Sequence, residues 1–285
     1  MHQNRRHCTR TLGLGLIFIA AIHTPLIGRA ADQSAKVLTG DDYLTPNFHP
    51  GQTYSNVFSI LSSRKAEGYD EHAGRNGGSA DYTVLSSNAT VWRFKVMERY
   101  DGQPAEHPRE SEMRDAGRTH CHVNADGKDE CQPYLDASGL TYNPALWGVP
   151  PKQLTAGMSW KVDIRQAWEL GGKNGVETVT VVRVDPLTRT ATLMREGTGE
   201  GFYTEGVGYE EASTVQLSHK GQTESFDVTP GITHWKGYTT FVKGIVFSDE
   251  LLVTRDDVLR GKDGKTVNAA GRRIMLLNAS PFPTL

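Results

Sequence analysis

Hydrophobic and polar residues alternate along much of the chain, which is the pattern of β-strands that face water on one side. Trp160, Val162 and Ile164 fall on one side of an extended strand, with charged residues between them. Trp92 and Phe94 alternate with charged residues in the same way. The same pattern predicts further strands at 178–184, 190–195, 213–218, 239–247, 251–254 and 273–277.

Turn-forming residues separate these strands, for example at 171–175, 185–186 and 229–231. No segment beyond an N-terminal apolar run carries a helical stripe over three turns. Strands that follow one another so regularly, each polar on one face, form antiparallel sheets. The sequence therefore predicts an all-β protein with a mostly antiparallel curved sheet, arranged as a sandwich or a partly closed barrel.

The N-terminus has the order of an export signal. Arg5 and Arg6 precede an apolar run at 12–22, and small residues follow, with cleavage expected after Ala30 or Ala31. The apolar run is shorter than the roughly 20 residues that a membrane span needs. We therefore expect a signal peptide at 1–30 and a periplasmic or extracellular mature protein.

The remainder, 31–285, is predicted to be one mature β domain without a transmembrane segment, and three prolines suggest a sub-boundary near 142–154. Removing the four arginines of the signal peptide changes the formal net charge from −2 to −6. No basic run is long enough to follow a phosphate backbone. Nucleic acid is therefore excluded as an expected partner.

Two cysteines, Cys121 and Cys131, remain after export, and an oxidising compartment favours a disulfide between them. If they face each other across two antiparallel strands, His122 must lie opposite Glu130. The loop between the strands then ends at Gly127, where a left-handed backbone conformation favours glycine. These constraints agree on a single hairpin register.

The same register places His120 and His122 on one face of the hairpin, away from the disulfide, with Glu130 beside them. Two imidazoles and a carboxylate are a ligand set that suits a transition metal such as zinc, copper or nickel. The alternative is that these are surface histidines that bind no metal. A metal site there would need a fourth ligand or a water molecule, and a further acid or histidine from another strand would favour the enzyme alternative.

The sequence contains none of the common catalytic motifs: no nucleophile elbow, no His-Glu-x-x-His and no phosphate-binding loop. The aromatic residues Trp92, Phe94, Trp160 and Trp168 are candidates to line an apolar pocket in a curved sheet. More often such residues simply fill the core, and in a small barrel the core and the pocket can be the same place.

The sequence therefore favours an exported, non-catalytic binding protein. Its predicted partner is a small apolar ligand, or another envelope protein, held on a curved β-sheet. The first alternative is a metal-dependent enzyme that uses His120, His122 and Glu130. The second is a structural envelope protein without a ligand.

Overall fold

The computed structural model describes residues 38–103, 109–123, 126–133, 139–165, 174–201 and 214–279. The predicted signal peptide at 1–30 lies outside these residues, as does Trp168. Among the helices of the described residues, none has the length and apolar character to span a membrane.

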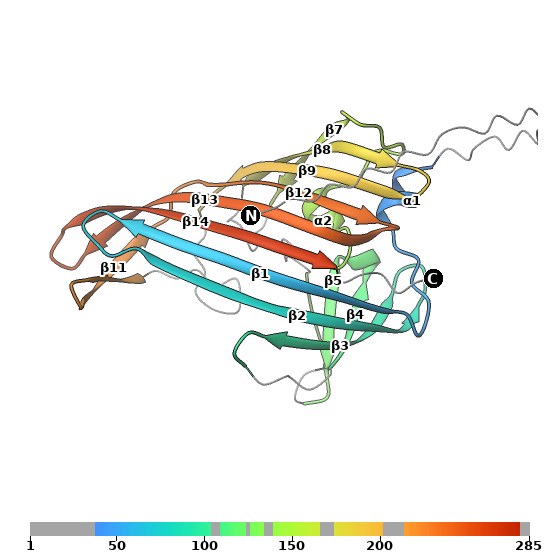
Figure 1. Cartoon of the computed structure of the whole chain (residues 1–285), viewed down its shortest axis with the longest axis horizontal. Coiled ribbons are helices and arrows are strands. Elements are labelled where there is room, and N and C mark those ends of the chain that lie inside the picture. The colour runs from blue at the N-terminus through green and yellow to red at the C-terminus, as the bar shows by residue number, and fades with distance from the viewer. Residues whose placement is uncertain are drawn as a thin grey trace, which may run out of the picture. The chain divides into compact units, whose positions relative to one another are not determined.

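The described residues form one antiparallel sheet of 14 strands, with very few helices (Figure 1). The main path of neighbouring strands is β6-β5-β4-β3-β2-β1-β14-β13-β12-β9-β8-β7, and β10 and β11 continue from β13. The strands are β1 (Thr53–Ala66), β2 (His72–Ser87), β3 (Trp92–Tyr100), β4 (Arg109–Arg114), β5 (Thr119–Val123), β6 (Asp129–Pro133), β7 (Ser159–Ile164), β8 (Gly175–Asp185), β9 (Thr190–Gly199), β10 (Thr214–His219), β11 (Gln222–Thr229), β12 (Thr233–Val242), β13 (Ile245–Gly261) and β14 (Thr266–Ala279). The helical turns are α1 (Gly40–Leu44), η1 (Asp115–Gly117) and α2 (Pro144–Trp147). The prediction of an all-β, mostly antiparallel curved sheet is confirmed, and the sheet is not closed.

One face of the sheet can be followed from strand to strand, because residues paired across neighbouring strands lie on the same side. On β2, Gly78 lies two residues from Asn76 and on the same side of the strand. Gly78 pairs with Tyr100 of β3, and Tyr100 lies on the same side of β3 as Trp92 and Phe94. The row that starts at Asn76 continues through Ile60, Met275, Leu251, Gly237, Arg195 and Val179 to Trp160. Trp92 and Phe94 therefore lie on the same face of the sheet as Trp160, Val162 and Ile164.

We call this side the inner face, because α1 and α2 pack onto it. Tyr43 and Leu44 of α1 and Leu146 and Trp147 of α2 belong to one buried cluster with residues of β7, β8, β9 and β12–β14. Both helices lie at the end of the sheet where the short strands β3–β5 and β7–β9 gather, at the right of Figure 1. The segment 142–154, which was predicted as a sub-boundary, carries α2 and packs onto the same sheet.

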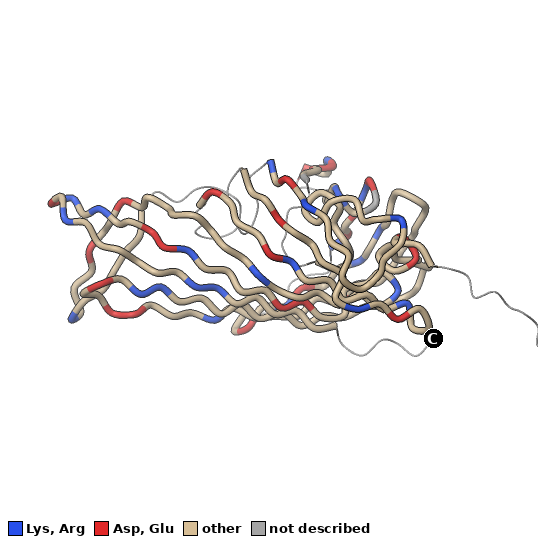
Figure 2. The backbone as a smooth tube through the Cα atoms, turned by 90° about the horizontal axis from the view of Figure 1, so that it is seen from above, with Lys and Arg blue, Asp and Glu red and all other residues tan. Residues whose placement is uncertain are grey.

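The long strands β1, β2, β13 and β14 extend beyond the helices toward the other end, where β11 lies (Figure 1). There a second apolar cluster forms on the inner face, with Phe226, Leu259 and Val267 at its centre. Charged residues of both signs are spread along the strands, as Figure 2 shows. The inner face therefore has a buried cluster at each end of the long strands.

Candidate functional site

A buried ion pair lies under the helices on the inner face. Arg195 Nε is 3.2 Å from Glu177 Oε1, and both side chains are fully buried. The indole Nε1 of Trp235 donates to Glu177 Oε2 at 2.6 Å. Gly197 makes room for this indole, since a Cβ there would lie 2.4 Å from its ring carbons. The pair is thus packed and hydrogen-bonded through Arg195 Nε, while Arg195 Nη2 is buried without a hydrogen bond among the described residues.

The helix α2 closes over this pair. The ring of Trp147 lies 4.4 Å from Arg195 Cζ, a cation–π contact. The backbone oxygen of Trp147 accepts hydrogen bonds from Trp160 Nε1 at 2.8 Å and from the Tyr142 hydroxyl at 2.9 Å. Burial, with a smaller contribution from the charge of Glu177, raises the pKa of Tyr142 well above its ordinary value. This helix-covered end of the inner face is therefore sealed by side chains of the protein itself.

The aromatic residues predicted to line a pocket are mostly part of this packing. Trp92 and Phe94 are 4% and 1% exposed, and both make edge-to-face contacts with Phe48. Trp160 is half-buried and is held by its bond to Trp147. The role of these residues in ligand binding stays a prediction, and their present contacts are those of a core.

The inner face opens between the two buried clusters. There the side chains are small or long and cationic: Ser62 and Arg64 on β1, Gly74 on β2, and Gly271 and Arg273 on β14. Ser62 and Gly74 are exposed, while the other three are half-buried. A Cβ added to Gly271 would meet nothing closer than a backbone oxygen at 3.5 Å. We call these five residues the central band.

Apolar side chains border the central band. Ile60 and Phe58, two and four residues before Ser62 on the same side of β1, are both half-buried. Phe58 makes an edge-to-face contact with Tyr100, and it lies over Gly78, where a Cβ would come within 2.7 Å of its ring. A molecule that lay on the central band would therefore meet apolar surface along β1.

Polar groups of β12 and β13 lie on the other side of the central band. Arg255, which is in register with Gly271, pairs with Asp257 through Nε–Oδ1 at 2.6 Å and Nη2–Oδ2 at 3.0 Å. Thr233 is in register with Arg255 and is 1% exposed. Its hydroxyl has no hydrogen-bond partner among the described residues. Among the described residues, Asn56 Oδ1 and Arg195 Nη2 are the other buried side-chain atoms without a hydrogen bond.

The sequence contains a signal for the central band that the strand predictions did not use. Arg273 stands on the apolar side of β14, between Val267 and Met275. Arg255 and Asp257 stand in the same way on the apolar side of β13. Charged residues in the apolar phase of a long strand are unusual in a core and indicate a polar site.

The predicted hairpin register is confirmed. Cys121 and Cys131 form a disulfide, with Cα atoms 4.1 Å apart, and His122 lies opposite Glu130. Gly127 has a φ of +75°, the left-handed conformation expected at the end of the loop. Residues 124 and 125 of that loop lie outside the described residues. The disulfide joins β5 to the edge strand β6.

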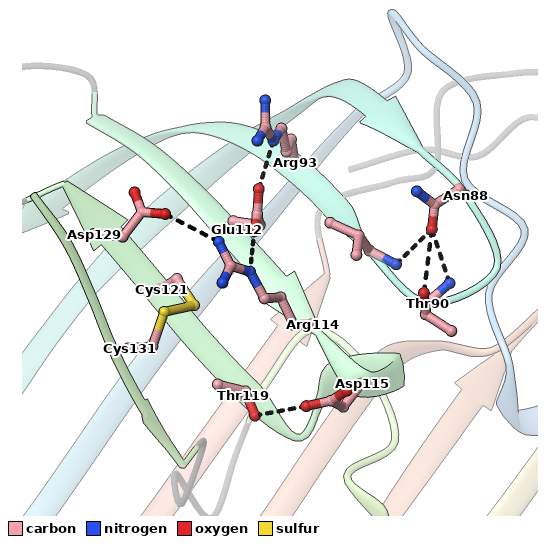
Figure 3. Close-up of polar contacts among 11 residues, drawn as sticks. Asn88, Thr90, Arg93, Glu112, Arg114, Asp115, Thr119, Cys121, Asp129 and Cys131 are labelled. Atoms are coloured by element: carbon pink, nitrogen blue, oxygen red, sulfur yellow. Dashed lines mark hydrogen bonds and ion pairs between the residues drawn. A yellow bond between two sulfur atoms is a disulfide. The ribbon is translucent and has the colours of Figure 1, made fainter.

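Charged residues surround the disulfide on the outer face, as Figure 3 shows. Glu112 accepts from Arg93 Nε at 2.5 Å and also from Arg114, whose Nη2 is 3.1 Å from Asp129. Burial alone would raise the pKa of the Glu112 carboxyl, but the hydrogen bonds from the two arginines outweigh it and lower that pKa. Since these charges alternate in sign and satisfy one another, they offer no strong field to a ligand.

The histidines of the hairpin lie on the inner face, but they do not form a complete metal site. The rings of His120 and His122 are 6.1 Å apart. His120 Nε2 is 2.7 Å from the Ser111 hydroxyl, and His122 Nε2 is 3.7 Å from Glu130 Oε2. Within the described ranges, no group of three His, Cys, Asp or Glu side chains is arranged to hold a metal ion. The metal-dependent enzyme therefore stays a prediction, and the described residues supply no further ligand for its metal.

The outer face carries a groove of about 350 Å³ on β8, β9, β12 and β13. Val176 and Leu252 form its apolar part, and the exposed ion pair between Lys236 and Glu196 lies beside them. This groove is the main competitor of the central band for an apolar molecule.

Comparison with known proteins gives only distant likenesses. No family model and no curated protein matches the chain. A solved structure of lipovitellin is 8% identical with a TM-score of 0.36, and the match covers 84% of this chain and 26% of lipovitellin. A LolA superfamily protein from Nitrosomonas europaea is 11% identical with a TM-score of 0.23, covering 86% of this chain and 91% of that protein. The attachment invasion locus protein Ail of Yersinia pestis is 8% identical with a TM-score of 0.16, covering 81% and 100%. The chain thus spans about a quarter of lipovitellin, and none of these values assigns it a function.

Proposed function

We propose that the protein is an extracytoplasmic binding protein that holds a small apolar molecule on the inner face of its sheet, at the central band. The observation that carries this proposal is the opening itself. Side chains of the protein bury the inner face at both ends of the long strands, and the band between them is lined by three small residues and two arginines. A sheet that needed only a core would fill these positions with larger apolar side chains.

The apolar border supplies the binding energy in this proposal. Phe58 and Ile60 remain half-exposed beside exposed Ser62 and Gly74. Covering such surface contributes about 25 cal/mol for each square ångström removed from water. An apolar ligand along β1 would therefore complete the burial that the chain leaves unfinished there.

The proposed compartment is periplasmic or extracellular. Its support is the Cys121–Cys131 disulfide, because structural disulfides persist mainly in oxidising compartments. An envelope protein as partner remains the second form of the binding prediction.

The proposal can be tested with a neutral fluorescent apolar probe, N-phenylnaphthylamine, and two neighbouring substitutions on β1. Ile60→Gln places a polar amide at the border of the central band. Leu61→Gln makes the same chemical change on the outer face, where Leu61 is 39% exposed. We expect Ile60→Gln to weaken probe binding about tenfold, since it removes roughly one buried side chain of contact. Leu61→Gln should bind like the wild type.

Denaturation midpoints of both variants show whether they fold, and binding is compared only between folded proteins. Equal probe affinity in the wild type and in folded Ile60→Gln would place the probe elsewhere and would overturn the proposal. A loss of binding in Leu61→Gln alone would move the site to the outer face.

A further inference from the structure

We infer that the ligand of the central band is an amphiphile with an anionic headgroup, and that Arg273 binds this headgroup while the apolar border receives its chain. This inference rests on the proposed function and names the ligand class of the same site. Its first support is charge, because arginines outnumber carboxylates among the described inner-face residues at this place.

Gly271 lies at the centre of that excess. Its cross-strand partners are Arg64 on β1 and Arg255 on β13, and Arg273 follows two residues later on the same side of β14. Among the described inner-face residues within two positions on these three strands, Asp257 is the one carboxylate. Three guanidinium groups therefore gather around a residue that has no side chain, and since Arg64 and Arg255 both have polar partners, the inference depends on Arg273.

The carboxylate of Asp257 already accepts hydrogen bonds from other groups of the protein. Asp257 holds Arg255 through two hydrogen bonds and also accepts from the Gly231 backbone N–H at 3.2 Å. Arg273 makes no hydrogen bond or ion pair with any residue that the structure describes. A half-buried guanidinium is costly to leave without an anion, so an anionic ligand would stabilise it.

A hydrogen-bond donor completes the set. The hydroxyl of Thr233 is buried, lies in the row of Arg255 and Gly271, and lacks a partner among the described residues. A hydroxyl can donate to the oxygen of a phosphate or carboxylate. Gly271 and Gly74 carry no side chain that would stand between these groups and a headgroup, and a Cβ at either position would lie in ordinary van der Waals contact at 3.5 Å.

The position of the apolar border fits the chain of an amphiphile. Ile60 and Phe58 lie four and six residues from Arg64 on the same side of β1, which is about 13 and 20 Å along a strand. An alkyl chain that starts at the arginines and runs along β1 therefore reaches both side chains. Charge at one end and apolar surface along the path select an amphiphile over a free anion.

The test compares dodecyl phosphate, dodecanol and inorganic phosphate as ligands of the full-length mature protein, measured by displacement of N-phenylnaphthylamine and by calorimetry. Arg273→Gln is the test variant, and Arg273→Lys retains the charge. Arg272→Gln is the matched control, because Arg272 is the exposed neighbour on the outer face. We expect Arg273→Gln to weaken dodecyl phosphate about tenfold and to leave dodecanol unchanged. Arg272→Gln should change neither, and Arg273→Lys should retain most of the affinity.

The outcomes separate this inference from the proposed function. If dodecanol binds but Arg273→Gln leaves dodecyl phosphate unaffected, the headgroup inference is overturned and the apolar site stands. If neither amphiphile binds, both fail. If inorganic phosphate binds as tightly as dodecyl phosphate, the site recognises a free anion and the amphiphile is overturned.

Discussion

The helix-covered end and the central band belong to the same face of the same sheet, but they differ in whether their arginines have a carboxylate partner. At the helix-covered end, Arg195 has Glu177 beside it, an indole bonded to that carboxylate and Trp147 above it. In the central band, Arg273 has no ion pair with any described residue, and Gly271 beside it would accept a Cβ without a clash. One arginine is buried in a core beside its carboxylate, and the other has no anion beside it among the described residues.

The comparison teaches how function can be recognised on a continuous sheet face. Apolar side chains alone do not mark a site, because Trp92 and Phe94 are packed by Phe48. An interruption of burial, small residues and an excess of one charge together indicate a place for a ligand. The predictions below test whether the two regions differ as this comparison requires.

The largest effect is expected at the helix-covered end. Glu177→Gln should destabilise the protein by about 3–5 kcal/mol, because it leaves the charge of Arg195 buried without a carboxylate. Chemical denaturation measures this loss. Glu196→Gln is the control, since it makes the same change in an exposed ion pair with Lys236 and should leave the midpoint nearly unchanged. Similar midpoints for both variants would show that the covered end is not packed as described.

A smaller difference in stability is expected between alanine substitutions of a glycine in each region. Gly197→Ala should cost about 1–3 kcal/mol, since its Cβ would lie 2.4 Å from the Trp235 ring. Gly271→Ala should stay within about 0.5 kcal/mol, because nothing lies closer than 3.5 Å to its Cβ. Thermal unfolding of the two variants checks the difference. An equally large loss at Gly271 would mean that the central band is filled.

Much of the fold could be predicted from the sequence because its signals are local. Alternation over a few residues identifies strands and their faces, and the disulfide with Gly127 fixed the register of the β5–β6 hairpin. The same reasoning could not show that this hairpin lacks a complete metal site among the described residues. That depends on which strands come to lie beside it.

The central band was missed for the same physical reason. Arg64 and Arg273 are more than two hundred residues apart in sequence, and only the pairing of β1 with β14 brings them to one place. A single strand shows Arg273 as one charged residue among apolar ones. Its meaning follows from the order of strands in the sheet, which alternation does not specify.

The most direct test of the central claim is photolabelling with a neutral long-chain alcohol that carries a diazirine, followed by mass spectrometry that assigns adducts to single residues. We predict adducts on inner-face residues at the central band and its border, at Ile60, Ser62 and Arg273, and their loss when unlabelled dodecanol competes. Adducts confined to the outer-face groove at Val176 and Leu252, or adducts that dodecanol does not reduce, would contradict the account.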